Sequence, residues 1–167
     1  RPLPRPRFRR ERWELPDGDF LDVDRLDAAP GAALLVVSHG LEGSSRAPYV
    51  RGLAAAAARA GLAVAAWNFR GCSGEPNRLL RQYHSGETGD LDHVVRRLAA
   101  EAPGRSLVLA GFSLGGNQLV KWLGERGDSV PATLRAAVAV SVPFDLDACA
   151  AALDGPGPWP FLYRERF

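Results

Sequence analysis

The residues with the clearest chemical potential lie in a Gly-x-Ser-x-Gly pattern, whose fixed positions are Gly111, Ser113 and Gly115. A serine at the centre of this pattern acts as a nucleophile when it lies on a tight turn between a strand and a helix, because that turn projects its hydroxyl above the sheet. Glycine is needed on either side, since a larger side chain does not fit beside the turn. We therefore predict that Ser113 is a catalytic nucleophile; the alternative is an ordinary turn serine.

A second glycine-containing segment, His39-Gly40-Leu41-Glu42-Gly43, follows an apolar run earlier in the chain. In a hydrolase with a serine nucleophile, a loop at this place supplies one backbone amide of the oxyanion hole, and the residue after the nucleophile supplies the other. These amides are assigned to Leu41 and Leu114, and Gly40 lets the backbone approach the substrate oxygen closely. His39 is interpreted as a brace for its own loop through hydrogen bonds, with a role as general base as the alternative.

The polar segment from Asn68 to Gly86 is too long and too rich in glycine to be a simple connection. It leaves the carboxyl end of an expected strand, which is the edge where open α/β sheets bind ligands. Two interpretations remain open, namely that the segment lines the substrate pocket or that it braces it. His84 within it is an alternative candidate for the general base, whereas His93 is expected to be a solvated surface histidine.

The pattern of apolar residues indicates which elements must position these side chains. Apolar runs bounded by turn residues predict strands buried on both faces: Ala32–Val37, Leu62–Trp67, Ser106–Ala110 and Leu134–Val140. Amphipathic segments between and after them predict helices: Tyr49–Ala60, Glu87–Ala102, Leu114–Gly124 and Asp145–Leu153. This alternation predicts an α/β fold with a mostly parallel sheet and helices on both faces.

The first part of the chain has a different pattern. Turn residues at 16–19 separate Arg12–Leu15 from Phe20–Leu26, which predicts a hairpin at one edge of the sheet with a half-exposed second strand. Arginine and proline are interleaved in residues 1–12, which predicts an extended, solvated arm, with a role at membranes or nucleic acids as the alternative. Residues 13–167 are expected to belong to a single domain.

Composition argues against several classes of function. The chain has 167 residues, 46% of them hydrophobic, and a net charge of +2, which favours a globular protein without a dedicated nucleic-acid surface. The histidines and the two cysteines, Cys72 and Cys149, lack the spacing of a metal site or a disulfide framework, and no apolar run reaches the ~20 residues of a membrane span. We expect a cytoplasmic protein that acts on a small molecule without a cofactor, in an oligomeric state that the sequence leaves open.

Together these motifs resemble those of the YheT-like hydrolases of the α/β-hydrolase superfamily. The resemblance extends over nearly the whole chain and rests on PDGDFLD at 16–22, HGLEGSS at 39–45, NFRGCSGE at 68–75, YHSGET at 83–88, GFSLGGN at 111–117 and VPFDL at 142–146. It implies the α/β-hydrolase fold and the hydrolysis of carboxylic esters of short- to medium-chain acyl groups, or of lipid esters. It further implies an acyl-enzyme on Ser113 and a Ser-Asp-His triad without a metal.

The resemblance also implies that part of the catalytic machinery lies outside this chain. Members of the family continue past the position of Phe167, and their triad acid and histidine lie in later strands and loops. We therefore expect the N-terminal part of the fold, truncated before the last strands and, since it contains no Met, without its native start. Such a fragment is expected to be nearly inactive by itself. Asp145 is an alternative candidate for the acid.

Two further interpretations of function remain open. A degenerate or truncated α/β-hydrolase domain can serve as a binding or interaction module rather than as an enzyme. An acyltransferase would use the same serine and would differ only in whether an alcohol or water accepts the acyl group. The sequence identifies neither the acyl chain nor the alcohol of a substrate.

Overall fold

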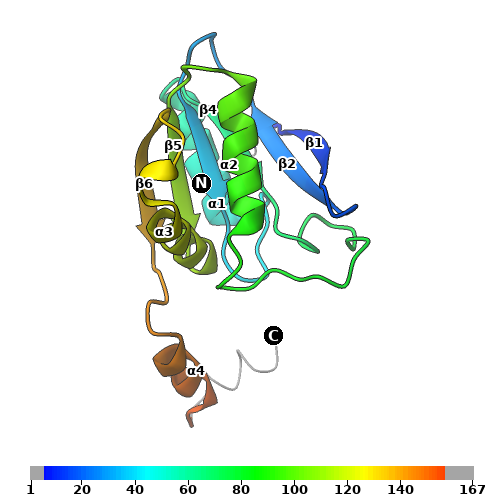
Figure 1. The fold of residues 1–167 in the computed structure, drawn as a ribbon, viewed down its shortest axis with the longest axis vertical. Helices are drawn as coiled ribbons and strands as arrows, with labels where there is room; N and C mark the ends of the chain where they lie inside the picture. Colours follow the sequence, from blue (N-terminus) through cyan, green and yellow to red (C-terminus); the bar gives the residue numbers. More distant parts are fainter. Residues whose placement is uncertain (1–5, 157–167) are drawn as a thin grey trace.

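The computed structural model describes residues 6–156, which form one mixed sheet in the order β1-β2-β4-β3-β5-β6 (Figure 1). The strands are β1 Arg9–Glu14, β2 Phe20–Leu26, β3 Leu34–Ser38, β4 Ala63–Trp67, β5 Leu107–Phe112 and β6 Leu134–Val140. The helices are α1 Pro48–Arg59, α2 Gly89–Glu101, α3 Leu114–Arg126 and α4 Leu146–Asp154, with a 3₁₀ turn at Gly127–Ser129. Each strand and helix expected from the sequence is present, with bounds that differ by a few residues.

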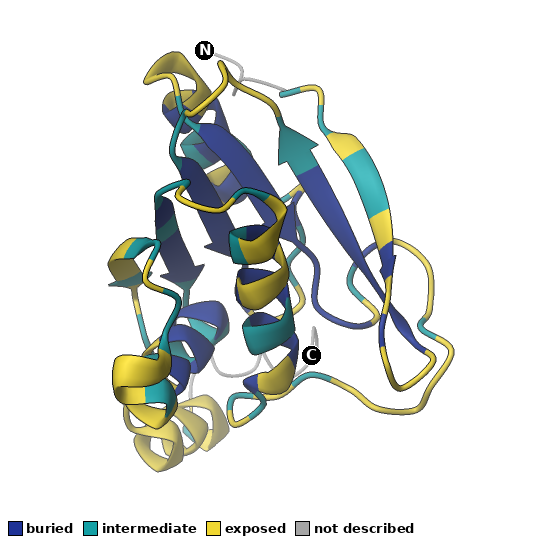
Figure 2. Cartoon of the chain, turned by 45° about the horizontal axis from the view of Figure 1, so that its top comes forward, coloured by how far each residue is buried: buried dark blue, intermediate teal, exposed yellow. Residues whose placement is uncertain are grey.

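Strands β4, β3, β5 and β6 run parallel to one another, because a helix carries the chain across a face of the sheet between successive strands of this group. Helix α1 packs on one face, where Val50 and Ala54 join apolar residues of β3 and β4. Helices α2 and α3 pack on the other face, where they contribute Leu91 and Trp122 to the core. Figure 2 shows the burial of the central strands between these layers. The predicted mostly parallel α/β sheet with helices on both faces is confirmed.

The N-terminal hairpin extends the sheet at one edge, where β1 pairs antiparallel with β2 and β2 pairs antiparallel with β4. Strand β1 begins at Arg9, so residues 9–12 lie in the sheet rather than in the solvated arm predicted for residues 1–12. The reason is that β1 places its arginines beside acidic partners. Arg10 forms two hydrogen bonds with Asp24, and Arg12 forms two with Asp22. Residues 1–5 lie outside the described part of the chain.

Strand β2 differs from its prediction for the same reason. The alternation of its residues predicted a half-exposed strand, but Asp22 and Asp24 are only 1% and 4% exposed. A buried carboxylate is tolerated where charged hydrogen-bond donors replace water, and the guanidinium groups of β1 provide them. The acidic face of β2 is therefore covered by protein rather than by solvent.

Strand β6 lies at the opposite edge and is mostly exposed, although its apolar sequence predicted a strand buried on both faces. Among the described residues it pairs with β5 alone, so one side of its backbone and much of its surface remain open. The pairing contains a register shift: Leu107 is opposite Leu134, whereas Val108 is opposite Ala136. Arg135 is thus an extra residue in β6, as in a β-bulge.

A buried arginine fixes the polar segment between β4 and α2. Arg70 is 2% exposed and binds Asp90 through two nitrogens at 2.8 Å each. Its guanidinium also lies 2.9 Å from Asp19 and 2.9 Å from Asp17, both in the turn of the hairpin. These charge-assisted bonds join the polar segment to the hairpin on one side and to the start of α2 on the other.

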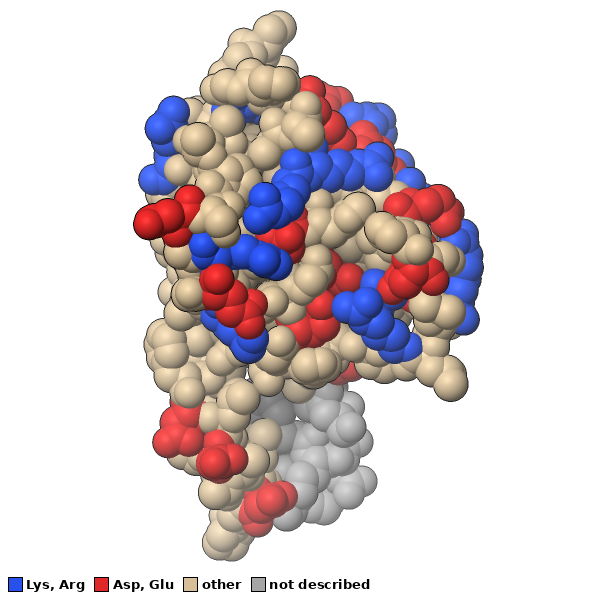
Figure 3. Space-filling view, in the orientation of Figure 1, with Lys and Arg blue, Asp and Glu red and all other residues tan. Residues whose placement is uncertain are grey.

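Ion pairs also cover the surface of α2. Figure 3 shows Lys and Arg side chains interspersed with Asp and Glu on the face of the molecule that carries this helix. Arg96 pairs with Asp92 and Arg97 pairs with Glu101, each one turn away along α2. On this face the positive charges are therefore balanced by neighbouring carboxylates rather than gathered into a patch.

Candidate active site

Ser113 lies at the junction between β5, which ends at Phe112, and α3, which begins at Leu114. Its backbone has φ 50° and ψ −118°, a conformation that residues other than glycine rarely adopt. The Ser113 amide donates a hydrogen bond of 2.8 Å to the carbonyl oxygen of Val140 at the end of β6. The serine is half buried on a strained turn, beside a helix N-terminus whose amides favour developing negative charge.

The glycines of the pattern allow three backbone segments to meet around Ser113. A methyl group on Gly115 would overlap the carbonyl oxygen of His39 and would lie 2.9 Å from Ser38 at the end of β3. A methyl group on Gly111 would lie 2.5 Å from the carbonyl oxygen of Gly115. The first turn of α3 therefore packs directly against the ends of β3 and β5, without space for a side chain between them.

The turn after β3 runs beside the serine. A methyl group on Gly40 would lie 3.2 Å from the Cβ atom of Ser113, so the backbone here is in close contact with the predicted nucleophile. The turn is closed by a hydrogen bond of 3.0 Å from the Gly43 amide to the Gly40 carbonyl oxygen. The Gly40 amide donates to the Tyr49 hydroxyl at 2.9 Å.

The two amides assigned to the oxyanion hole are both available as donors. Among residues 6–156, no acceptor is bonded to the amide of Leu41, whose side chain is half exposed. Leu114 is the first residue of α3, so its amide has no partner within the helix. An ester carbonyl oxygen close to Ser113 can thus approach donors from the β3 turn and from the α3 N-terminus.

His39 lies behind the turn and is 1% exposed. Its Nδ1 atom is 2.7 Å from the carbonyl oxygen of Gly40, and its Nε2 atom is 3.1 Å from the amide nitrogen of Phe69. A carbonyl oxygen only accepts and a backbone amide only donates, so Nδ1 carries the proton and Nε2 accepts. Both nitrogens are engaged, which leaves neither to take a proton from Ser113 and makes His39 a link between the turn and the segment after β4.

The buried His39 predicts a specific dependence of stability on pH. Burial lowers its pKa to about 4, against the opposing effect of the hydrogen bond to Gly40. The unfolded chain binds this proton near pH 6.5, so stability is complete above that pH and decreases as the pH falls toward 4. We expect urea unfolding to show a loss of about 2 kcal/mol between about pH 7.5 and about pH 5.

The variant His39→Gln should be less stable than the wild type at both pH values, but its free energy of unfolding should no longer show this slope with pH. The control is His84→Gln at an exposed histidine, which should keep it. The buried carboxylate of Asp24 contributes little in this window. Although burial opposes the shift, pairing with Arg10 lowers the pKa of Asp24 below 3.8. An unchanged slope in His39→Gln would rule out His39 as its source.

A buried polar network, which the sequence analysis missed, holds the far end of the same turn. Asp24 accepts hydrogen bonds from the hydroxyl of Ser45 and, at 3.3 Å, from the side-chain amide of Asn68. The side-chain oxygen of Asn68 accepts from the Ser45 amide at 2.9 Å. The sequence contained a signal only for the pairing of Asp24 with β1, since Asp22 and Asp24 alternate along one strand as Arg10 and Arg12 do along the strand before it.

Three other titratable residues named in the sequence analysis, His84, His93 and Asp145, do not contact Ser113 through a hydrogen bond among the described residues. His84 is exposed, and its Nδ1 atom accepts a hydrogen bond of 3.2 Å from the Gly86 amide. His93 is half buried rather than solvated, and its Nε2 atom has no partner among the described residues. Asp145 caps α4 by accepting from the Ala148 amide at 2.8 Å, and this helix stands off the sheet (Figure 1). In residues 6–156, no hydrogen bond joins a histidine to the Ser113 hydroxyl.

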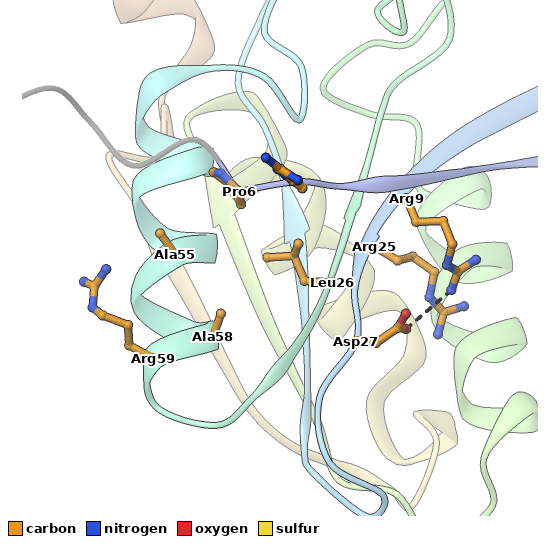
Figure 4. Close-up of a pocket in the computed structure, with 9 residues that line it drawn as sticks. Pro6, Arg9, Arg25, Leu26, Asp27, Ala55, Ala58 and Arg59 are labelled. Carbon is orange, nitrogen blue, oxygen red and sulfur yellow. Dashed lines mark hydrogen bonds and ion pairs between the residues drawn. The ribbon is translucent and has the colours of Figure 1, made fainter.

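Two cavities differ in their relation to this site. A cavity of about 610 Å³ lies beside the β3 turn, with Glu42 and Tyr83 in its wall. Another, of about 490 Å³, lies between α1 and the end of β2, where Arg9 pairs with Asp27 (Figure 4). The end of β2 is paired with the start of β4, so the second cavity is at the amino ends of the parallel strands. Ser113 follows the carboxyl end of β5, so this cavity and the serine turn lie at opposite ends of the parallel strands.

The described part of the chain contains neither a metal-binding cluster nor a helix that could cross a membrane. Within residues 6–156, no group of three or more His, Cys, Asp or Glu side chains is arranged to hold a metal ion. In the same range, every helix is too short or too polar to cross a membrane. The thiols of Cys72 and Cys149 are both free, the first half buried and the second exposed.

The sequence of this chain is similar to those of known proteins. A family model described as serine aminopeptidase, S33, matches residues 29–154. The chain is 47% identical to the putative esterase YheT of Escherichia coli (strain K12), over 84% of this chain and 42% of that protein. It is 34% identical to a monoacylglycerol lipase of Saccharomyces cerevisiae, over 83% of this chain and 29% of that protein. The chain thus spans less than half the length of these relatives.

A solved structure supports the fold independently. The esterase Pf2001 of Pyrococcus furiosus superimposes with a TM-score of 0.73, over 89% of this chain and 55% of that one. The two sequences are 21% identical, so this likeness concerns the fold alone. It agrees with the α/β fold described above.

Proposed function

Because this chain belongs to the serine aminopeptidase S33 family of α/β-hydrolases and is YheT-like, we propose that the protein hydrolyses carboxylic esters through an acyl-enzyme on Ser113. The observation that carries the proposal is the strained turn at Ser113, with φ 50°, packed against the amide-bearing turn at Gly40. The names of the relatives, an esterase and a lipase, favour a small-molecule carboxylic ester or a lipid ester. The resemblance to the YheT-like hydrolases adds the expectation of a short- to medium-chain acyl group.

In the proposed reaction the Ser113 oxygen attacks the ester carbonyl carbon while its proton passes to a general base. The carbonyl oxygen becomes an oxyanion, which the amides of Leu41 and Leu114 hold. The base returns the proton to the departing alcohol, and water then releases the acid and restores Ser113. Each amide donates a hydrogen bond that strengthens as charge develops on the oxygen, so both contribute in the transition state.

We further propose that the general base is a histidine outside residues 6–156, oriented by an acidic residue. The support is that both nitrogens of His39 are engaged and that no described histidine is bonded to Ser113. Residues 6–156 by themselves are then expected to keep only the residual rate that binding and oxyanion donors supply, about 10³- to 10⁴-fold over water.

The proposal is tested by trapping the covalent intermediate in the full-length protein. We expect a fluorophosphonate probe to modify Ser113, because an activated serine attacks phosphorus as it attacks an ester carbonyl. Turnover of p-nitrophenyl butyrate should fall in proportion to labelling, and peptide mass spectrometry identifies the modified residue. Labelling of a different residue, or ester turnover that survives complete labelling, would contradict the assignment of Ser113.

The same experiment separates the other two functions that the sequence allowed. A full-length protein that neither reacts with the probe nor hydrolyses any ester of a chain-length series would favour a binding or interaction module. Addition of an alcohol distinguishes an acyltransferase, which would form a new ester in place of the free acid. Free acid as the main product in the presence of alcohol supports hydrolysis.

A further inference from the structure

Two tyrosine hydroxyls hold the amides on either side of Leu41. The Gly40 amide donates to Tyr49, and the Glu42 amide donates to Tyr83, each at 2.9 Å. The next amide along the turn closes it on the Gly40 carbonyl oxygen. Within the described residues, the amide of Leu41 is therefore the one donor in this turn without an acceptor.

Tyr83 contacts Glu42 twice. Its hydroxyl accepts from the Glu42 amide and donates to the Glu42 carboxylate at 2.8 Å. The backbone of Glu42 has φ 51°, a left-handed conformation that is unfavourable for a residue with a side chain. The paired hydrogen bonds oppose relaxation of Glu42 to an ordinary conformation. Any such relaxation would rotate the peptide group between Leu41 and Glu42, which adjoins the peptide group that carries the Leu41 N–H.

The ring of Tyr83 is itself anchored. Its centroid lies 4.9 Å from that of Phe69, which lies 4.0 Å from the His39 ring. Burial raises the pKa of Tyr83 well above its usual value, and the Glu42 carboxylate adds to that effect. The hydroxyl therefore keeps its proton at neutral pH and can donate and accept at the same time.

We propose that Tyr83, acting through Glu42, is a positioning residue that aims the Leu41 amide at the substrate oxygen. This inference rests on the proposed function, because the amide has a task only if an oxyanion forms. A donor displaced by about 1 Å loses much of its effect on the transition state. The long polar segment that carries Tyr83 thereby acquires the bracing role that the sequence left as one of two alternatives.

The test uses Tyr83→Phe in the full-length protein, which removes the hydroxyl and keeps the ring against Phe69. We expect kcat for p-nitrophenyl butyrate to fall about 10- to 100-fold and KM to change by less than about 3-fold, since the donor acts mainly on the transition state. Affinity for a trifluoromethyl ketone, whose adduct carries an oxyanion, should fall by the same factor as kcat. The control is Ser129→Ala, which removes an exposed hydroxyl that donates to the Arg126 carbonyl oxygen.

A second variant separates positioning from stability. Glycine adopts φ 51° without strain, so Glu42→Gly should unfold at the same temperature as the wild type or higher. Its kcat should nevertheless fall about 10-fold, because the Tyr83 hydroxyl loses its acceptor. Hydrogen exchange of the peptide that contains the β3 turn should be faster in both variants, a readout that does not depend on catalysis.

Each outcome bears on one claim. Wild-type kcat and inhibitor affinity in Tyr83→Phe, in a protein with turnover that depends on Ser113, would overturn the positioning role and leave the proposed function intact. A lower melting temperature with unchanged inhibitor affinity would reduce Tyr83 to a structural role. Absence of turnover that depends on Ser113 in the wild type would overturn the proposed function itself.

Discussion

Replacement of Ser113 by alanine is expected to lower kcat for ester hydrolysis by about 10⁶-fold in the full-length protein, because no acyl-enzyme can form and only binding and the amide donors remain. KM should change by less than about 3-fold, since the hydroxyl contributes little to the binding of an unreacted ester. Steady-state kinetics with p-nitrophenyl butyrate measure both quantities. Turnover above about 1% of the wild-type rate would show that another group is the nucleophile.

The same position allows a test of the strain in the turn. Ser113→Gly lacks the hydroxyl and should be as inactive as Ser113→Ala. Because glycine adopts φ 50° freely, Ser113→Gly should be more stable than Ser113→Ala by about 1 kcal/mol. Ser141 is a matched control, because it is an exposed serine with φ 53° that follows β6. Ser141→Ala should therefore retain activity. Equal stabilities of Ser113→Gly and Ser113→Ala would mean that the turn is not strained at this residue.

Replacement of Gly115 by alanine is expected to lower the free energy of unfolding by more than about 3 kcal/mol. The added methyl group would overlap the carbonyl oxygen of His39, and both are backbone-bound atoms that can separate only if α3 moves away from β3. That movement also carries Leu114 and Ser113, so turnover should fall at least about 100-fold in the fraction that remains folded. Urea unfolding and kinetics on the same preparation measure the two effects.

The matched control lies in the same helix. A methyl group on Gly124 meets no atom within 4 Å. Gly124→Ala should therefore raise stability by up to about 1 kcal/mol through helix propensity and leave turnover unchanged. A Gly115→Ala variant that matched Gly124→Ala in stability and turnover would show that the contact between α3 and β3 is looser than described.

The parts of this molecule that sequence patterns predicted are those whose residues are neighbours in the chain. The strand before Ser113, the turn at the serine and the helix after it form a continuous segment. Their hydrophobic periodicity and the glycines were therefore sufficient to predict these elements. The exposure of β6 was not predictable in this way, because an apolar strand can have the same sequence pattern at the centre and at the edge of a sheet. The position of a strand in the sheet depends on the order of all the others.

The contacts that brace the candidate site are long-range, which explains why patterns missed them. Glu42 and Tyr83 are separated by 41 residues, and Asp24 and Asn68 by 44. Local propensity contains no information about such pairs. Glu42, Asn68 and Tyr83 belong to sequence strings named above, but their partners became evident only when the strand order brought the hairpin and the two loops together.

The extra residue at Arg135 has a consequence at the other end of its strand. Successive carbonyl groups of a strand point in opposite directions, so a shift by one residue reverses the direction of every carbonyl that follows. The insertion sets the parity of β6 so that Val140 stands opposite Phe112 and turns its oxygen to the Ser113 amide. Without the extra residue, the Val140 carbonyl oxygen would point away from the Ser113 amide. The hydrogen bond that aligns the Ser113 amide thus depends on an extra residue five positions before Val140 in β6.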